Sequence, residues 1–133
     1  MQERQTKQKQ IIYEALQYLD HPTATEVYGR VQEIAPTVSR ATVFRVLGGF
    51  AGGGRALELK LAGAETRYDY NVVPHYHARC RVCGRVSDVE TEPFFGEVAN
   101  KTADGFCVEG YTLEFYGKCV ECAKILSERE QNC

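Results

Sequence analysis

Apolar residues recur at helical spacing in three segments of the first half of the chain. Residues 6–20 form an amphipathic pattern that predicts a helix ending at His21. A second helix is expected from the capping-box pattern "TATE", which starts at Thr23, to Pro36. A third helix begins at Ser39 in "SRATVFRVLGGF". The residues expected to face inward are Ile12, Ala15, Leu16, Leu19, Val27, Val31, Ile34, Val43, Val46, Leu47 and Phe50.

The pattern then changes from helical spacing to alternation. The stretch "AGGGR" breaks the third helix. Each glycine inside a helix costs on the order of 1 kcal/mol relative to alanine, so an early end at Leu47 is an alternative. Residues 56–61 and 66–72 alternate and predict two strands joined by a turn. Three short helices and a hairpin are the order of a winged helix-turn-helix, whose third helix enters the major groove of DNA.

The second half has a different order of elements. We expect a strand at 85–90, a helix at 93–103, a long strand at 106–117 and a final helix at 120–130. The sequence contains no internal repeat and no low-complexity segment, and the boundary between the halves is expected near residues 71–78.

The fold class is therefore predicted to be α+β in two parts. Residues 1–72 would form a winged helix-turn-helix, and residues 73–133 a small α/β domain. A domain near 65 residues buries a modest core and often needs a metal or a partner subunit. No apolar run approaches the roughly 20 residues of a membrane span, and the polar start "MQERQTKQKQ" lacks the apolar region of a signal peptide. We therefore expect a cytoplasmic protein without membrane association.

The charge is unevenly divided. Residues 1–70 hold 9 Lys/Arg and 8 Asp/Glu, whereas residues 71–133 hold 7 and 10. A local basic face in the first half would suffice for phosphate contacts, although charged residues usually mark only a solvated face. The basic residues that could share such a face are Arg4, Lys7, Lys9, Arg40, Arg45, Arg55, Lys60 and Arg67.

Four of the six cysteines form two CxxC pairs. Cys80 and Cys83 are separated from Cys119 and Cys122 by 35 residues. Two such pairs make a tetrahedral four-sulfur shell, which favours Zn²⁺ in a closed structural site. A thioredoxin-like dithiol is the alternative, but no βαβ pattern surrounds either pair. Of the two remaining cysteines, Cys107 is expected to pack in a strand and Cys133 lies at the chain end.

Two of the three histidines lie beside the first CxxC pair. On an extended segment His75 and His77 point to the same side and can reach one ion, although solvent exposure or an ordinary hydrogen bond is the simpler interpretation. The third histidine, His21, lies at a helix end in the first half. Asp69 and Asp88 flank the His-x-His segment on predicted strands. A site drawing on both halves would link domain orientation to metal occupancy.

These motifs resemble a known family. The runs "HPTATEVY", "SRATVFRVL", "RYDY", "HYHARCRVCG" and "YGKCVEC" are similar, in order and spacing, to the ferric uptake regulator family, and within it to the peroxide-sensing type. The resemblance covers nearly the whole chain. It implies a homodimeric repressor that binds a double-stranded DNA operator, with a C-terminal dimerisation domain, a structural zinc site and a regulatory metal site at the domain junction.

Carried over residue by residue, the resemblance assigns roles to specific positions. It implies a structural zinc site on the four CxxC cysteines. The regulatory ligands it implies are His21, Asp69, His75, His77 and Asp88. The candidate DNA contacts are Arg40, Thr42, Phe44 and Arg45.

Some positions depart from the patterns of the family. The iron-uptake branch usually shows His-His-Asp-His before its first CxxC and a further histidine in a later strand. Here these places hold "PHYH" and Tyr111, which favours peroxide sensing. Phe44 occupies the position in the recognition helix where the family usually has a tyrosine, and Lys9 stands where the family commonly has an arginine.

The expected mechanism follows from the donor types. Three imidazoles and two carboxylates suit Fe²⁺ or Mn²⁺ as the regulatory metal. The resemblance implies that peroxide converts His21 or His75 to 2-oxo-histidine when iron is bound, so the protein is a sensor and not an enzyme. The alternatives are a sensor of Fe, Zn or Ni availability, a zinc-dependent thiol redox protein, and a DNA-binding dimer whose histidine site is structural.

Overall fold

The computed structural model describes residues 2–61, 64–91 and 104–131 of the 133-residue chain. The chain divides into two compact units, Met1–Val73 and Pro74–Cys133. Within the described ranges, no helix is both long and apolar enough to cross a membrane.

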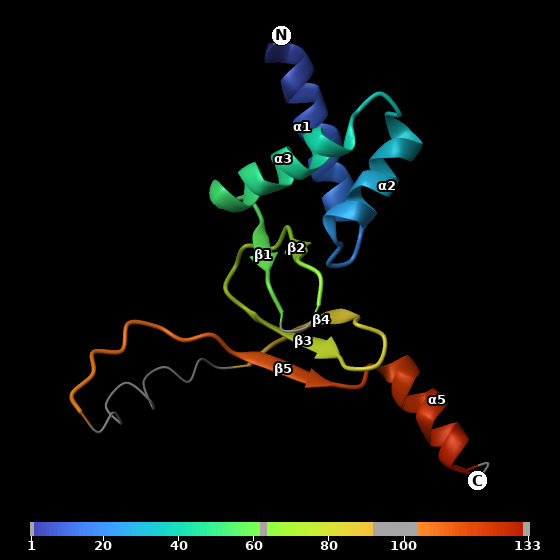
Figure 1. The fold of residues 1–133 in the computed structure, drawn as a ribbon, viewed down its shortest axis with the longest axis vertical. Helices are drawn as coiled ribbons and strands as arrows, with labels where there is room; N and C mark the ends of the chain where they lie inside the picture. The colour runs from blue at the N-terminus through green and yellow to red at the C-terminus, as the bar shows by residue number, and fades with distance from the viewer. Residues whose placement is uncertain (1, 62–63, 92–103, 132–133) are drawn as a thin grey trace. The chain divides into compact units, whose positions relative to one another are not determined.

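Unit 1 contains three helices followed by a hairpin (Figure 1). The helices are α1 (Gln2–Tyr18), α2 (Ala24–Ile34) and α3 (Arg40–Gly52). Side-chain oxygens cap the second and third helices: Thr23 accepts from the backbone N–H of Glu26, and Ser39 from that of Thr42, both over 3.1 Å. Each cap satisfies a backbone donor that the first helical turn leaves unpaired, which contributes about 1 kcal/mol.

The apolar faces of the three helices meet in one core. Its most enclosed members, all fully buried, are Ile12, Leu16, Val27, Val31, Val43 and Leu47. Burial of each such side chain stabilises the fold by roughly 1.5–3 kcal/mol. The predicted inward faces are thus confirmed, except that Leu19 is only partly buried against the core and Ile34 is 52% exposed. Ile34 is the last residue of α2.

The hairpin consists of β1 (Leu57–Leu59) and β2 (Arg67–Asp69), paired antiparallel with Leu57 opposite Asp69. Both strands are shorter than the sequence predicted. An early end of α3 at Leu47 is wrong, because the helix continues through two glycines to Gly52. Phe50 explains this continuation, since its side chain is 96% buried in the core and holds the last turn in place.

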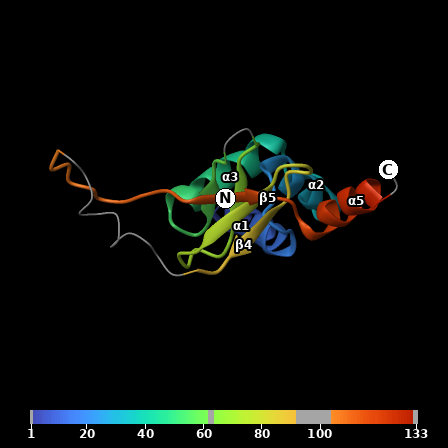
Figure 2. The same ribbon diagram turned by 90° about the horizontal axis from the view of Figure 1, so that it is seen from below.

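Unit 2 is built on a three-stranded sheet in the order β4-β3-β5. Strand β3 (Tyr76–Cys80) pairs antiparallel with β4 (Val86–Val89) and parallel with β5 (Glu114–Gly117). Helix α5 (Val120–Gln131) begins three residues after β5 and extends away from the sheet in both views (Figure 1; Figure 2).

The expected elements of the second half are partly corrected. The long strand predicted from Phe106 is wrong for residues 106–113, because strand pairing begins only at Glu114. The alternation of apolar and polar residues is real there, but the described structure gives this stretch no partner strand. The strand at 85–90 and the helix at 120–130 are confirmed within a residue or two. The predicted helix at 93–103 lies outside the described residues.

Candidate metal centres

Parallel pairing of two strands in unit 2 brings the two CxxC motifs together. Cys80 at the end of β3 is the register partner of Gly117 at the end of β5, and Cys119 follows two residues later. The turn after Cys80 closes at Gly84, whose φ of +81° is a left-handed conformation that glycine adopts without strain. Cys119 and Cys122 stand at the start of α5. The first CxxC therefore lies on a tight turn and the second on a helix N-terminus.

The four sulfur atoms have the spacing of a metal shell. One Sγ from each of Cys80, Cys83, Cys119 and Cys122 lies within 4.8 Å of the others. The Cys83 and Cys119 sulfur atoms are 3.8 Å apart. Sulfur ligands about 2.3 Å from a zinc ion are about 3.8 Å apart in a regular tetrahedron. The donor set and its spacing therefore fit a structural zinc ion, and Cys80 and Cys122 are buried as such a closed site requires.

The surroundings favour one thiolate and disfavour another. The backbone N–H groups of Cys83 and Val82 lie 3.5 and 3.4 Å from the Cys80 sulfur. Hydrogen bonds from the backbone of Cys83 and then of Cys119 lower the pKa of Cys80 to about 5. The hydrogen bond with the Cys119 thiol, followed by burial, raises the pKa of Cys122 to about 12. Ionisation of all four clustered thiols is unfavourable, because the thiolates repel one another, unless a bound cation offsets their negative charge.

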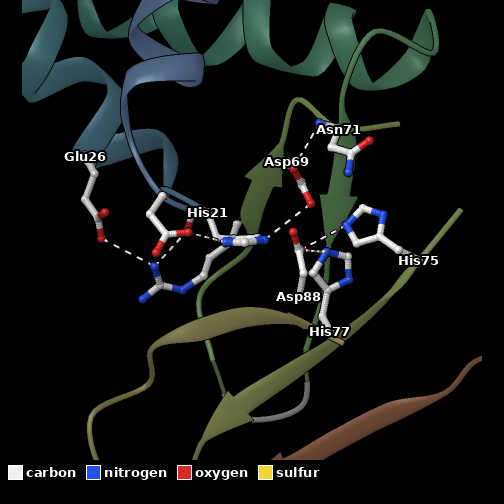
Figure 3. A network of polar contacts seen from close by, with 9 residues as sticks. His21, Glu26, Asp69, Asn71, His75, His77 and Asp88 are labelled. Atoms are coloured by element: carbon white, nitrogen blue, oxygen red, sulfur yellow. Dashed lines mark hydrogen bonds and ion pairs between the residues drawn. The ribbon is translucent and has the colours of Figure 1, made fainter. Parts of the chain in front are cut away.

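A second group of metal-type donors lies near the start of β3, whereas Cys80 lies at the end of this strand. His77 on β3 is the register partner of Asp88 on β4, so both side chains stand on one face. His75 precedes His77 by two residues, and their ring centroids are 4.4 Å apart. Both rings point at Asp88: its Oδ1 lies 3.0 Å from Nε2 of His75 and 3.5 Å from Nε2 of His77 (Figure 3). Two ligand atoms bound at right angles, each about 2.1 Å from a metal ion, are about 3 Å apart.

Unit 1 contributes a smaller pair of donors. His21, in the loop between α1 and α2, points its Nε2 toward Oδ2 of Asp69 on β2, 3.3 Å away (Figure 3). Both side chains are less than a tenth exposed. The other oxygen of Asp69, Oδ1, accepts a hydrogen bond of 2.9 Å from the backbone N–H of Asn71. Asp69 is therefore oriented with one oxygen bound by the backbone and the other directed at His21.

The candidate DNA contacts lie on the outer face of α3. Arg40, Phe44 and Arg45 are exposed and Thr42 is half-buried, while Val43 on the other face is fully buried. The Arg40 guanidinium lies over the Phe44 ring, 4.9 Å from its centroid. Since the core binds one face of the helix, the other face presents these side chains together.

Comparison with known proteins decides the family. The model of the ferric uptake regulator family matches residues 1–116. The chain belongs to the ferric uptake regulator family. A peroxide operon regulator of Bacillus subtilis (strain 168) is 38% identical over 124 residues, which are 91% of this chain and 85% of that protein. The peroxide-responsive repressor PerR of Staphylococcus aureus (strain USA300) is 36% identical over 126 residues, covering 90% and 82% of the two chains.

Solved structures of the ferric uptake regulator family share the fold. A Campylobacter jejuni peroxide stress regulator gives a TM-score of 0.69 at 25% identity and covers 90% of this chain and 91% of that chain. A zinc-bound manganese uptake regulator gives 0.65 at 25% identity over 85% and 88%. The predicted fold class is thereby confirmed: a winged helix-turn-helix followed by a dimerisation domain. Ferric uptake regulator proteins are DNA-binding transcription regulators that act as dimers, not enzymes.

The donor chemistry agrees with the two metals expected for this family. The four thiols form a soft, closed set that fits structural zinc. The imidazoles and carboxylates form harder sets that fit regulatory iron or manganese.

The structure also reveals supporting residues that sequence reasoning missed. Arg67, assigned from the sequence to the basic face, donates instead to the backbone of His21 and lies 3.8 Å from Glu26. Asp20 contacts the ring of His21. The only feature of the sequence that indicated a role for Asp20 was its position next to the candidate ligand His21. Nothing in the sequence indicated the contact of Arg67 with His21, because the two residues are 46 positions apart.

Proposed function

We propose that this protein is a homodimeric, metal-dependent repressor that senses peroxide through iron-catalysed oxidation of a ligating histidine. The observation that carries the proposal is the presence of two preformed groups of hard donors in a chain 36–38% identical to peroxide-responsive regulators. The metal is expected to control DNA binding, and peroxide to relieve repression.

The regulatory ion would use both groups of donors. His21 and Asp69 supply two ligands from unit 1, and the group of His75, His77 and Asp88 supplies three from unit 2. Neither group alone fills the shell of a six-coordinate ion, whereas five ligands leave one position open to a small molecule. A metal that needs both groups favours the arrangement of the units in which all five ligands meet.

The energetic demand on this switch is moderate. Moving a two-state equilibrium from mostly open to mostly closed takes about 5.5 kcal/mol of differential binding. Loss of one ligand need only remove part of that difference to release the units. Oxidation of a single histidine is therefore enough to act on the whole protein.

The proposed DNA contacts all lie on α3. Arg40 and Arg45 would contact DNA with the guanidinium groups that the exposed face presents, and Thr42 and Phe44 would lie beside them. Arginine binds guanine in a bidentate manner and also pairs with phosphate. Two copies of α3 in a dimer would then read two half-sites.

The sensing chemistry depends on what lies beside the ion. Ferrous iron, when bound, supplies the electrons that cleave the O–O bond of peroxide. One oxygen atom of hydrogen peroxide would be inserted at a ring C–H of His21 or His75 to give the oxo group, with the hydrogen moving to a ring nitrogen, and the other oxygen would leave as water. The modified ring is a poorer ligand. His21 and His75 are 9% and 11% exposed, so the ring carbons are shielded from oxidants in bulk solvent but adjacent to any formed at the site.

The test compares two metal forms of the same protein. Protein loaded with Fe²⁺ should lose DNA binding on peroxide treatment, in step with the gain of one oxygen atom on a peptide that contains His21 or His75. Protein loaded with Mn²⁺ should show neither change, since Mn²⁺ does not readily reduce peroxide in such a shell. Peptide mass spectrometry and a DNA-binding assay on the same samples provide both measurements.

The control variant is Asp88→Asn, which removes one anionic ligand and should weaken metal binding before any peroxide is added. Oxygen found only on cysteines would point to a thiol mechanism. Equal peroxide sensitivity of the Mn²⁺ form would leave a metal-availability sensor in place of the peroxide sensor.

A further inference from the structure

The backbone of His21 has an unusual conformation. Its φ is +45°, in the left-handed region, and within the described residues it is the only non-glycine residue with a positive φ. This conformation costs an L-residue roughly 1–2 kcal/mol, so surrounding contacts must hold it. Arg67 does so through a 2.9 Å hydrogen bond from Nη1 to the carbonyl oxygen of His21. The backbone N–H of Tyr68 also donates to the carbonyl of Pro22 over 2.8 Å.

The bend at His21 allows its side chain to meet that of its own neighbour. Oδ1 of Asp20 lies 2.5 Å from Nδ1 of His21. The opposite ring nitrogen, Nε2, faces Asp69. The two nitrogens of one imidazole are thus directed at two different carboxylates, one 64% exposed at the surface and one buried.

The two contacts are not equivalent once a metal binds. An ionised carboxylate only accepts hydrogen bonds, so the Asp20 contact requires a proton on Nδ1. A metal ion requires a lone pair, which Nε2 can offer beside Asp69. Histidine ligands commonly donate their second N–H to a carboxylate, which fixes the orientation of the ring.

We propose that Asp20 is a positioning residue for the regulatory metal site, which holds the His21 ring so that Nε2, and not Nδ1, binds the metal. The inference rests on the proposed function only in taking His21 as a ligand. Asp20 does not touch the metal. It acts by hydrogen bonding, and Arg67 assists by fixing the backbone from which the ring projects.

The test is a metal titration of dimeric, zinc-replete protein. Replacing an outer carboxylate of this kind commonly lowers metal affinity 10–100-fold. We expect Asp20→Ala to weaken Mn²⁺ binding about tenfold, at the low end because Asp20 is mostly exposed. Asp20→Asn keeps an acceptor oxygen and should recover most of the affinity. Glu33→Ala removes an equally exposed carboxylate of unit 1 and should leave the affinity unchanged.

A spectroscopic measurement separates positioning from a general structural effect. With diamagnetic Zn²⁺ in the histidine site, proton NMR should show a slowly exchanging Nδ1–H of His21 in the original protein and in Asp20→Asn. In Asp20→Ala this signal should be lost to exchange while the melting temperature stays the same. An unchanged signal and affinity in Asp20→Ala would overturn the proposal, as would a signal on Nε2–H with metal bound.

A further variant distinguishes failure of this inference from failure of the proposed function. If His21→Ala leaves Mn²⁺ affinity unchanged, His21 is not a ligand and the proposed site falls together with the inference. If His21→Ala abolishes binding but Asp20→Ala has no effect, the proposed site stands and only the role of Asp20 is rejected.

Discussion

Arg67 donates a hydrogen bond from Nη1 to the carbonyl oxygen of His21, joining two residues that are 46 positions apart. Arg67 begins β2, and the same strand ends at Asp69, whose carboxylate faces the His21 ring. One short strand therefore fixes both the backbone and the side chain of the candidate ligand. The same nitrogen of Arg67, Nη1, lies 3.8 Å from Oε1 of Glu26.

Removal of this hydrogen bond should destabilise unit 1. Arg67→Met keeps an apolar stem but no donor, and a hydrogen bond to a charged group contributes about 1.5–3 kcal/mol. We expect the free energy of unfolding, measured by urea denaturation, to fall by about that amount, and Mn²⁺ affinity to fall with it. Lys60→Met, in the same hairpin but 74% exposed, should change stability by less than about 0.5 kcal/mol. An Arg67→Met protein as stable as this control would show that water replaces the bond without cost.

DNA recognition should depend on the guanidinium of Arg45. A bidentate contact with guanine is worth about 1–3 kcal/mol, so Arg45→Ala should weaken operator binding by about that amount. Arg45→Lys retains the charge but cannot form the planar fork. We therefore expect it to restore binding to random DNA more than binding to the operator, as measured by fluorescence anisotropy. Zinc content and dimerisation serve as controls and should not change. Equal losses on both DNAs in Arg45→Ala would mean that Arg45 contacts only phosphate.

Zinc affinity at the cysteine site should rise with pH. The pKa of Cys80 is lowered to about 5, so this group is already a thiolate at neutral pH. The pKa of Cys122 is raised to about 12, so zinc must displace its proton. Uptake of zinc therefore releases at least one proton, and affinity should fall at least tenfold for each unit that the pH is lowered near neutrality. Competition with a chromophoric chelator measures this slope, and a flat profile would contradict the four-thiolate site.

The same site should be structural. Cys119→Ser leaves three thiolates and should abolish stable folding of unit 2, and with it the dimer. Circular dichroism and size-exclusion chromatography report these two losses. The control is Cys107→Ser, which changes an exposed cysteine outside the four-sulfur group and should retain both properties. A folded, dimeric Cys119→Ser protein would show that the zinc ion is dispensable.

Helix α3 should tolerate a better helix former at one of its glycines. A Cβ added at Gly48 meets no atom within 4 Å, so Gly48→Ala should stabilise unit 1 by about 0.4–1 kcal/mol through the unfolded state. Gly54 has an equally open surrounding but a φ of +78°, so Gly54→Ala should destabilise by roughly 1–2 kcal/mol. Calorimetric melting temperatures that shift in the same direction for both variants would refute this explanation.

The sequence by itself determined the elements whose signals are local. The spacing of Leu16, Val27 and Leu47 predicted the helices and their buried faces, because a repeat near 3.6 residues fits only one side of a helix. Thr23 and Ser39 predicted the caps, because the capping oxygen and the backbone N–H it accepts from lie within three positions. Two CxxC pairs predicted the zinc site, because four thiols at that spacing have few other uses.

Tertiary structure alone decided what depends on partners distant in the sequence. The alternation after Phe106 predicted a long strand, but a strand needs a neighbour to pair with, and pairing with β3 begins only at Glu114. The glycines after Leu47 predicted a short helix, but burial of Phe50 offsets the free energy that these glycines cost inside a helix. The role of Arg67 was hidden for the same reason. Its basic charge is visible in the sequence, whereas the carbonyl oxygen that it binds comes within reach only when β2 folds against the loop that carries His21.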